Sequence, residues 1–217
     1  MINDVAPQPL SGAVISMSEE RQNKKREKIL EGALRAFLSK GFAANMDAIA
    51  AEGGVAKQTV YTYFKDKESL FSALVDRLMD RFVSAGMTAE LMELEPPAFF
   101  RKIIQIAFQR MDDPEYIGLI KVILAESGRF PELADLYLTR LVRPGIESLT
   151  HYIKENPDLR FSDPEAVARI IHGALVNHMI SQEILNGKYS LPLSRERLAN
   201  GLLELVLFAA EQSKRAR

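Results

Sequence analysis

The sequence predicts an all-α protein of about nine helices, with three short helices in an N-terminal domain and the others in a larger domain behind it. Three observations carry this prediction. Apolar residues recur at three- and four-residue spacing through most of the chain. Proline stands repeatedly where such a pattern begins, and its missing donor is harmless in the first turn of a helix. The alternating pattern typical of a strand is not found.

Composition limits the classes of protein that the chain can belong to. Its 217 residues suffice for two modest domains, and 47% of them are hydrophobic, which is ample for a core. There is no cysteine, so disulfides and thiolate metal sites are excluded, as fits a reducing cytoplasm. We find no apolar run long enough to span a membrane and no export signal, and therefore expect a cytoplasmic protein that makes no membrane contact.

The first elements are expected in residues 1–66. Residues 1–19 should form a flexible tail, because prolines and a glycine interrupt them and no periodicity is sustained. A first helix should then run from about residue 20 to 39, where Ile29, Ala33 and Phe37 lie on one apolar stripe. Gly41 should end this helix.

Two short helices should follow, joined by a glycine turn. Asn45 can cap the first through its side chain, and Gly53-Gly54 can end it in the left-handed conformation. The second should cover residues 57–64, with Val60 and Phe64 facing inward and polar side chains facing out. Short helices crossing at such a turn form the helix-turn-helix pattern, so we expect residues 20–66 to bind DNA.

The charge of the chain is unevenly distributed. From Arg21 to Lys67 there are ten basic and five acidic residues, so this part carries +5 and the remainder −6. A basic end on an acidic body is expected when only one part meets phosphate. The run Lys24-Lys25-Arg26 could be an ordinary solvated helix face, but next to a helix-turn-helix we favour contact with phosphate.

This region resembles the DNA-binding domain of the TetR family of transcriptional regulators. The residues that carry the resemblance are Ile29, Ala33, Phe37, Gly41, Phe42, Ile49, Ala50, Gly54, Val55, Thr59, Val60, Tyr61, Tyr63, Phe64, Lys67, Glu68, Leu70 and Phe71. The resemblance implies a homodimeric, ligand-responsive regulator of double-stranded DNA, in most cases a repressor on a near-palindromic operator. Ala56 departs from the family, which usually has Ser or Thr there, and it removes a capping hydroxyl.

Base readout is expected near the start of the second short helix. Gln58 can pair with adenine, and the methyl group of Thr59 can meet that of thymine. Tyr61, Tyr63 and Lys67 suit phosphate oxygens better, although Tyr61 could instead pack against the first helix. The full predicted DNA-binding set is Lys24, Lys25, Asn45, Met46, Lys57, Gln58, Thr59, Tyr61, Thr62, Tyr63 and Lys67.

Residues 67–217 are expected to form the regulatory and dimerisation domain. They begin with a helix over 67–90, to which the resemblance assigns the role of a connector that transmits ligand-induced shifts. Prolines then mark further helix starts at Pro96, Pro114 and Pro131, and Pro144 should kink the last of these helices near Val142.

The last two helices are expected at residues 164–186 and 194–212. Both are apolar nearly all round, so they must be covered on two sides. Gly173 and Gly201 lie mid-helix and suggest close helix approach. We interpret the pair as the homodimer interface, which would form a four-helix bundle with its symmetry mate. The alternative is a deeply buried core of a monomer.

Residues 125–134 resemble the regulatory domain of the AefR-like and AcrR-like branch of the family. We expect an apolar pocket for a small hydrophobic ligand, lined by about a third of the candidates. The apolar and aromatic candidates are Phe99, Phe100, Ile103, Phe108, Tyr116, Ile120, Ile123, Leu124 and Tyr137. The polar candidates are Glu126, Asn177 and His178.

Catalytic patterns are absent from the sequence. His172 and His178 are six residues apart and fall on different faces of a helix, and there is neither a phosphate-binding glycine loop nor a nucleophile elbow. We therefore expect no enzyme, no metal and no cofactor. One alternative is a DNA-binding regulator controlled by a protein partner, which a body without a cavity of roughly 300 Å³ would favour. A helical enzyme or carrier is the remote alternative.

Overall fold

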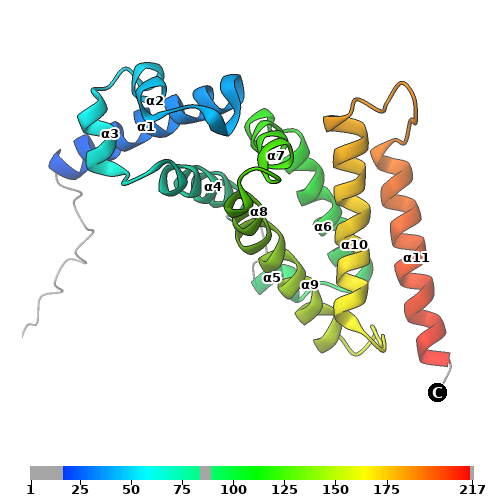
Figure 1. The fold of residues 1–217 in the computed structure, drawn as a ribbon. Coiled ribbons are helices and arrows are strands. Elements are labelled where there is room, and N and C mark those ends of the chain that lie inside the picture. Colours follow the sequence, from blue (N-terminus) through cyan, green and yellow to red (C-terminus); the bar gives the residue numbers. More distant parts are fainter. Residues whose placement is uncertain (1–16, 84–88, 216–217) are drawn as a thin grey trace, which may run out of the picture.

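The computed structural model describes residues 17–83 and 89–215, and in this part of the chain helices are the only regular structure (Figure 1). The first helix, α1, spans Met17–Lys40, and Glu19 and Glu20 stabilise the positive end of its dipole. The predicted tail over 1–19 therefore ends too late, because its last three residues belong to α1. Its other residues lie outside the described part.

The two short helices of the N-terminal domain form as expected. A 3-10 turn, η1 (Gly41–Ala43), leads into α2 (Met46–Gly53), where the side chain of Asn45 accepts a hydrogen bond of 2.9 Å from the amide of Ala48. Gly54 ends α2 in the left-handed conformation, with φ of 60°. The next helix, α3, spans Lys57–Tyr63, and Ala56 provides no capping hydrogen bond from its side chain.

The crossing of α1 and α2 requires a glycine. A Cβ added to Gly32 would lie 2.5 Å from the Cα of Gly53 and 2.9 Å from the carbonyl oxygen of Ile49. Both are backbone atoms that no side-chain rotation can move away. The two helix backbones therefore touch at this point, which fixes how α2 presents the turn that precedes α3.

Three aromatic rings join the N-terminal domain to the next helix, α4 (Lys67–Val83). Phe37, Phe42 and Phe71 are fully buried, and their ring centroids lie 5.2 to 5.6 Å apart. The predicted connector over 67–90 corresponds to α4 as far as Val83. Residues 84–88 lie outside the described part, and the short helix α5 (Ala89–Met92) follows them.

The middle helices begin at the predicted prolines. They are α6 (Pro96–Met111), α7 (Pro114–Glu126) and α8 (Pro131–Leu136), followed by a π-helical segment, η2 (Tyr137–Val142), and by α9 (Arg143–Glu155). The predicted interruption before Pro144 takes the form of this π-helical segment, because proline has no amide hydrogen to continue the α-helical pattern.

The last two helices lie at the end of the molecule opposite to α1–α3 (Figure 1). They are α10 (Pro164–His178), which continues as a π-helical segment, η3 (Met179–Ile184), and α11 (Arg195–Arg215). Asp163 caps α10 by accepting a hydrogen bond of 3.0 Å from Ala166, and Ser194 caps α11. Asn186, with a positive φ of 56°, lies in the turn after η3.

The N-terminal domain rests on α7 and α8. Leu38 of α1 lies against Gly118 of α7, where an added Cβ would come within 2.5 Å of the leucine methyl. The ring of Phe42 contacts that of Phe130, just before α8, with a centroid distance of 4.9 Å. These contacts give the body a direct path to the domain that carries α3.

Candidate nucleic-acid interface and ligand cavity

The outward side of α3 is open to solvent in the protomer. Val60 and Phe64 are buried beneath the helix, as predicted. Gln58, Tyr61 and Thr62 are exposed on the opposite side. The hydroxyl of Thr62 donates a hydrogen bond of 2.8 Å to the carbonyl oxygen of Gln58, which leaves the amide group of Gln58 as the side-chain donor and acceptor on this face.

Lys57 stands at the start of α3 and pairs with α2. Its ammonium group lies 2.7 Å from the carboxylate of Asp47, and both side chains are more than half exposed. This hydrogen bond and the charge of Asp47 raise the pKa of Lys57. Such exposed pairs are weak, so the lysine can exchange the carboxylate for a phosphate oxygen.

Two of the predicted DNA-binding side chains have contacts within the protomer, and their role at DNA stays a prediction. The Nζ atom of Lys67 donates a hydrogen bond of 2.6 Å to the carbonyl oxygen of Phe42 and lies 4.2 Å and 5.2 Å from the ring centroids of Phe42 and Phe130. These partners hold the ammonium group beside the two rings, and its contact with phosphate stays a prediction. Met46, in the first turn of α2, is buried in the protomer.

The other predicted DNA-binding residues differ in how far their side chains are exposed to solvent. Lys24 and Lys25 are exposed on α1, and Asn45 is exposed at the start of α2. Thr59 and Tyr63 are half-buried, and Tyr63 packs against the core. Tyr61 is 45% exposed, so part of its side chain is open to solvent, and neither its contact with phosphate nor its packing against the first helix is decided by this exposure.

A small apolar cavity of about 120 Å³ lies between α6, α9 and α10. Its walls are formed by Ile103, Ile106, Ala107, Gly145, Leu149, Ile171 and Leu175. Its polar groups are the guanidinium of Arg110 and the imidazole of His172. Burial lowers the pKa of both groups, and the neighbouring charges of Arg110 and Arg169 lower that of His172 further.

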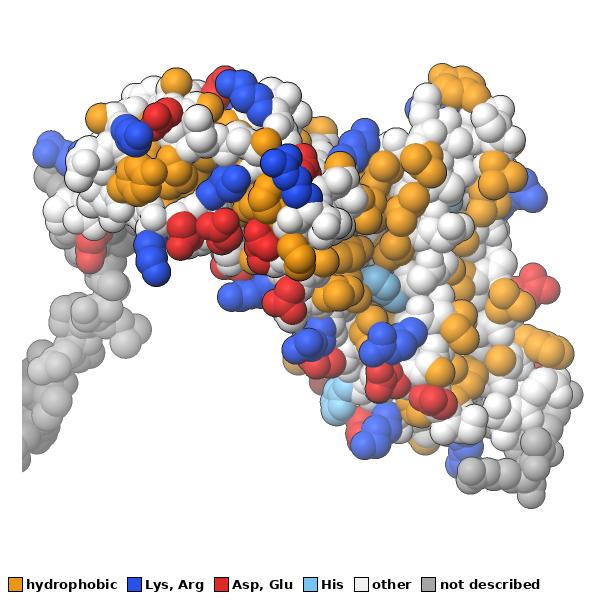
Figure 2. Space-filling view, viewed as in Figure 1, with side chains coloured by type: hydrophobic (Ala, Val, Ile, Leu, Met, Phe, Trp, Pro, Cys, Tyr) orange, Lys and Arg blue, Asp and Glu red, His pale blue; other side chains and the backbone are white. Residues whose placement is uncertain are grey.

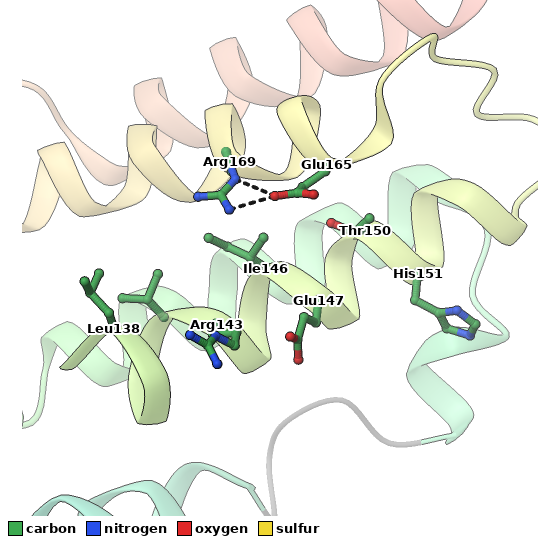
Figure 3. A pocket seen from close by; sticks show the side chains of 9 residues that line it. Leu138, Arg143, Ile146, Glu147, Thr150, His151, Glu165 and Arg169 are labelled. Atoms are coloured by element: carbon green, nitrogen blue, oxygen red, sulfur yellow. Dashed lines mark hydrogen bonds and ion pairs between the residues drawn. The ribbon is translucent and has the colours of Figure 1, made fainter. Parts of the chain in front are cut away.

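A larger hollow of about 510 Å³ lies between α9 and α10, and charged side chains line it together with the aliphatic Leu138, Val142 and Ile146 (Figure 3). Arg143 and Glu147 line it from α9, and Glu165 and Arg169 line it from α10, where they form an ion pair of 2.7 Å. Its volume exceeds the roughly 300 Å³ typical of a ligand pocket, and its lining mixes four charged side chains with three aliphatic ones.

Of the predicted ligand-binding residues, only Ile103 lines the small cavity. Phe99 and Phe100 pack against the ring of Tyr152, and Tyr116, Ile120 and Ile123 are buried in α7. The exposed members are Leu124 and Asn177, whereas Glu126 lies beside Gly41. Tyr137 is half-buried in η2, and Phe108 contacts the buried ring of His178 at a centroid distance of 5.8 Å.

Arg110 is the residue of this cavity that sequence reasoning missed. It follows Ile103 and Ala107 at the i, i+4, i+7 spacing, so a charged residue occupies the apolar stripe of α6. A charge in such a stripe is the signal that could have indicated it, because buried charges are rare without a partner. The residues from α9 and α10 carried no such signal.

One face of α10 and α11 is apolar and uncovered in the protomer, as Figure 2 shows on the right-hand side. Ile170 is 66% exposed, Leu205 is 70% exposed and Phe208 is 60% exposed. A Cβ added to Gly173 or Gly201 would meet nothing within 4 Å. The expected close approach at these glycines is therefore not made by another helix of the same protomer.

Within residues 17–83 and 89–215, no group of three or more histidine and carboxylate side chains could hold a metal ion. No helix in the same ranges combines the length and the hydropathy needed to cross a bilayer. The imidazole of His178 is buried, and its Nδ1 atom has no hydrogen-bond partner.

Two family models match the chain in sequence order. The model of "Bacterial regulatory proteins, tetR family" matches residues 29–74, which include α2, α3 and the start of α4. The model of the "AefR-like transcriptional repressor, C-terminal domain" matches residues 99–207, half of the chain. The two matched regions contain the helix-turn-helix and the small apolar cavity, respectively.

Individual relatives extend over most of the chain. The HTH-type transcriptional regulator YhgD of Bacillus subtilis, itself uncharacterised, is 27% identical over 83% of this chain and 93% of its own length. Among solved structures, the flavonoid-responsive regulator FrrA has a TM-score of 0.63 at 27% identity, over 88% of this chain and 97% of that one. The SmeT–triclosan complex has a TM-score of 0.68 at 19% identity, over 86% and 91%, and shows likeness of fold alone.

Proposed function

Because this chain belongs to the TetR family of bacterial regulatory proteins, we propose that it is a homodimeric repressor that a small hydrophobic ligand releases from a near-palindromic operator. Membership of the family makes it a DNA-binding transcriptional regulator rather than an enzyme. The repressor role, the dimer, the operator and the ligand are the parts that we propose.

The observation that carries the proposal is the open side of α3. Gln58 and Tyr61 project from a short helix whose other side is anchored by buried Val60 and Phe64. An α-helix fits the major groove, where an amide side chain can read adenine through two hydrogen bonds. Lys24, Lys25 and Lys57 would add phosphate contacts that set orientation but carry no sequence information.

Dimerisation is supported by the uncovered face of α10 and α11, which includes Ile170, Leu205 and Phe208. Monomeric proteins rarely leave a contiguous apolar surface of this kind in water. A two-fold axis through this face would give a four-helix bundle and two copies of α3. The copies would enter successive major grooves about 34–36 Å apart, so the operator would be near-palindromic.

Ligand control is supported by two structural relatives, the flavonoid-responsive FrrA and the triclosan complex of SmeT. This chain has an apolar cavity in its body, and the contacts of Leu38 with Gly118 and of Phe42 with Phe130 link that body to the N-terminal domain. By linkage, if the ligand lowers the affinity of the protein for DNA by some factor, DNA must lower its affinity for the ligand by the same factor.

Selection of bound DNA from a random pool tests the DNA-binding part. We expect two half-sites related by a two-fold axis. Gln58→Ala should relax one base-pair position in each half-site by about 1–3 kcal/mol, whereas Lys24→Met should weaken all sequences about equally and reduce the salt dependence. If both variants lost the same affinity for selected DNA as for random DNA, the assignment of these contacts would be contradicted.

Sedimentation equilibrium tests the dimer. Phe208→Glu places a charge in the uncovered face and should convert the dimer into monomers, because an unpaired charge is not tolerated in an apolar interface. Leu124→Glu is the matched control, since this leucine is also exposed on a helix but lies on α7. A dimer that survives Phe208→Glu unchanged would place the interface elsewhere.

A further inference from the structure

The turn between α7 and α8 contacts the N-terminal domain through an aromatic ring. Phe130 is the last residue of this turn, and its ring meets that of Phe42 edge to face at a centroid distance of 4.9 Å. Phe42 is fully buried in η1, where its ring lies 5.6 Å from that of Phe37 and 5.4 Å from that of Phe71. A residue of the body therefore reaches the aromatic core of the domain that carries α3.

The backbone of this turn fixes where the ring points. The amide of Phe130 donates a hydrogen bond of 2.8 Å to the carbonyl oxygen of Glu126, the last residue of α7. Pro131 follows and keeps the backbone of Phe130 out of the helical conformation, with φ of −128° and ψ of 85°. The carbonyl oxygen of Phe130 accepts a hydrogen bond of 3.0 Å from the amide of Leu133, which is buried in α8. The ring is thus carried by a turn that is tied at both ends to helices of the body.

The N-terminal domain can follow this ring as a rigid unit. Phe37 belongs to α1, and α1 meets α2 in the backbone contact of Gly32 with Gly53. Val60, beneath α3, is fully buried in the same core. Because such interiors are close-packed, a displacement at Phe42 moves α3 with it and does not merely deform the domain. The position of the ring therefore influences the angle at which α3 meets DNA.

Two other contacts between the same domain and the body are more compliant. Leu38 rests on Gly118 of α7, but its side chain is 44% exposed and can adopt other rotamers. Arg77 of α4 lies 3.3 Å from the carboxylate of Glu27 in α1 and 3.8 Å from that of Glu115 in α7. These carboxylates are 48% and 37% exposed, and ion pairs of this kind are weak and screened by salt. The contact between the two rings needs no charge on either ring, so salt does not screen it.

We propose that Phe130 is a positioning residue for operator binding: by holding Phe42, it sets the angle of the N-terminal domain on the body, and with it the separation of half-sites that the dimer accepts. The inference rests on the proposed function, because it needs two copies of α3 on one duplex. It goes further in giving a residue outside the DNA-binding domain a part in specificity that requires no ligand. Each α3 reads its own half-site in the same way with or without the ring.

Binding of the full chain to three kinds of duplex tests the inference. They are the site selected from the random pool, a single half-site, and the selected site with its half-sites moved apart or together by one or two base pairs. Each base pair changes the separation by about 3.4 Å. We expect Phe130→Ala to weaken binding to the selected site by roughly 5- to 20-fold, because a loosely held second domain has a lower effective concentration at its half-site. Affinity for the single half-site should be unchanged, so the preference for the selected spacing should shrink.

Other variants separate positioning from folding. Phe130→Tyr keeps the ring and should restore the parent preference, whereas Phe130→Leu keeps much of the apolar volume without a ring and should resemble Phe130→Ala. Phe161→Ala is the matched control, because Phe161 is also half-buried and packed against the core. It lies before α10, which begins at the end of the body away from α1–α3 (Figure 1), so its loss should leave the spacing preference intact.

Three results would overturn the inference. Phe130→Ala could weaken the single half-site as much as the selected site, which would assign the ring to the stability of the N-terminal domain. The spacing preference could stay unchanged in Phe130→Ala and Phe130→Leu, or Phe130→Tyr could fail to restore it. Selection that returned no paired half-sites would remove the proposed function and this inference together, whereas paired half-sites with an unaltered spacing preference would overturn the inference alone.

Discussion

Replacement of Lys67 by methionine separates two roles for this residue. Its position at a helix start suits a phosphate contact, whereas in the structure the ammonium group makes a hydrogen bond of 2.6 Å to the carbonyl oxygen of Phe42 and lies over two aromatic rings. Methionine keeps most of the apolar stem and removes the charge. The first role predicts a loss of DNA affinity, and the second predicts a loss of stability.

The expected loss of stability follows from these contacts. A hydrogen bond from a charged group contributes about 1.5–3 kcal/mol, and each cation–π contact at an exposed site about 0.5–1 kcal/mol. Lys67 is half-buried, so water screens part of this sum, and we expect the free energy of unfolding to fall by about 2 kcal/mol. For a chain of this length, that lowers the thermal midpoint by roughly 4–8 °C.

The assay combines thermal unfolding with DNA titrations at several salt concentrations between about 50 and 200 mM. A phosphate contact contributes about 0.9 to the slope of log K against log salt, so its loss from both protomers of a dimer would lower the slope by about 1.8. We expect the slope to stay the same and the midpoint to fall. Lys65→Met, at an exposed lysine two residues earlier, should leave the midpoint unchanged. A fall of about 1.8 in slope with an unchanged midpoint would refute the structural role.

Three further predictions concern packing, assembly and pH. Gly32→Ala should lower the free energy of unfolding, measured in urea, by about 1–3 kcal/mol, because the added Cβ meets the backbone of Gly53. Alanine by itself favours a helix over glycine, so a gain in stability would contradict the close crossing of α1 and α2. If α10 meets its symmetry mate at Gly173, Gly173→Ala should raise the dimer dissociation constant at least tenfold in sedimentation equilibrium. Unchanged or tighter association would exclude a close contact between the two helices at this glycine. Burial lowers the pKa of His172 and His178, so the unfolded chain binds more protons than the folded one below about pH 6.5. Stability should therefore be greatest above about pH 6.5 and fall towards pH 5.5, and His172→Gln should make urea-unfolding curves less dependent on pH than those of the parent chain.

The local structure was largely predictable because it depends on neighbours in the sequence. The cap at Asn45, the left-handed stop at Gly54 and the inward pair Val60 and Phe64 are set by contacts within four residues. The same holds for the proline-marked starts of α6 and α7 and for the interruption before Pro144. The helix-turn-helix, and with it the family, could therefore be identified before any coordinates.

The ligand site could not be predicted in the same way. Aromatic side chains such as Phe99 and Phe100 were expected to line a pocket, yet Tyr152, some fifty residues later, fills the space beside them. Whether a buried apolar residue packs or lines a cavity depends on how completely the opposite helix fills the space. A periodic stripe carries no information on that point.

The sequence by itself determined the helices, most of their starts and the polar side of α3, because backbone hydrogen bonding and apolar periodicity act over one or two turns. Only the tertiary structure decided that the ammonium group of Lys67 lies on Phe42, that Met46 is buried, and that Arg110 shares a cavity with His172. These positions depend on how helices distant in sequence cross. Helix crossings are set by the fit of whole side-chain surfaces and not by any single segment.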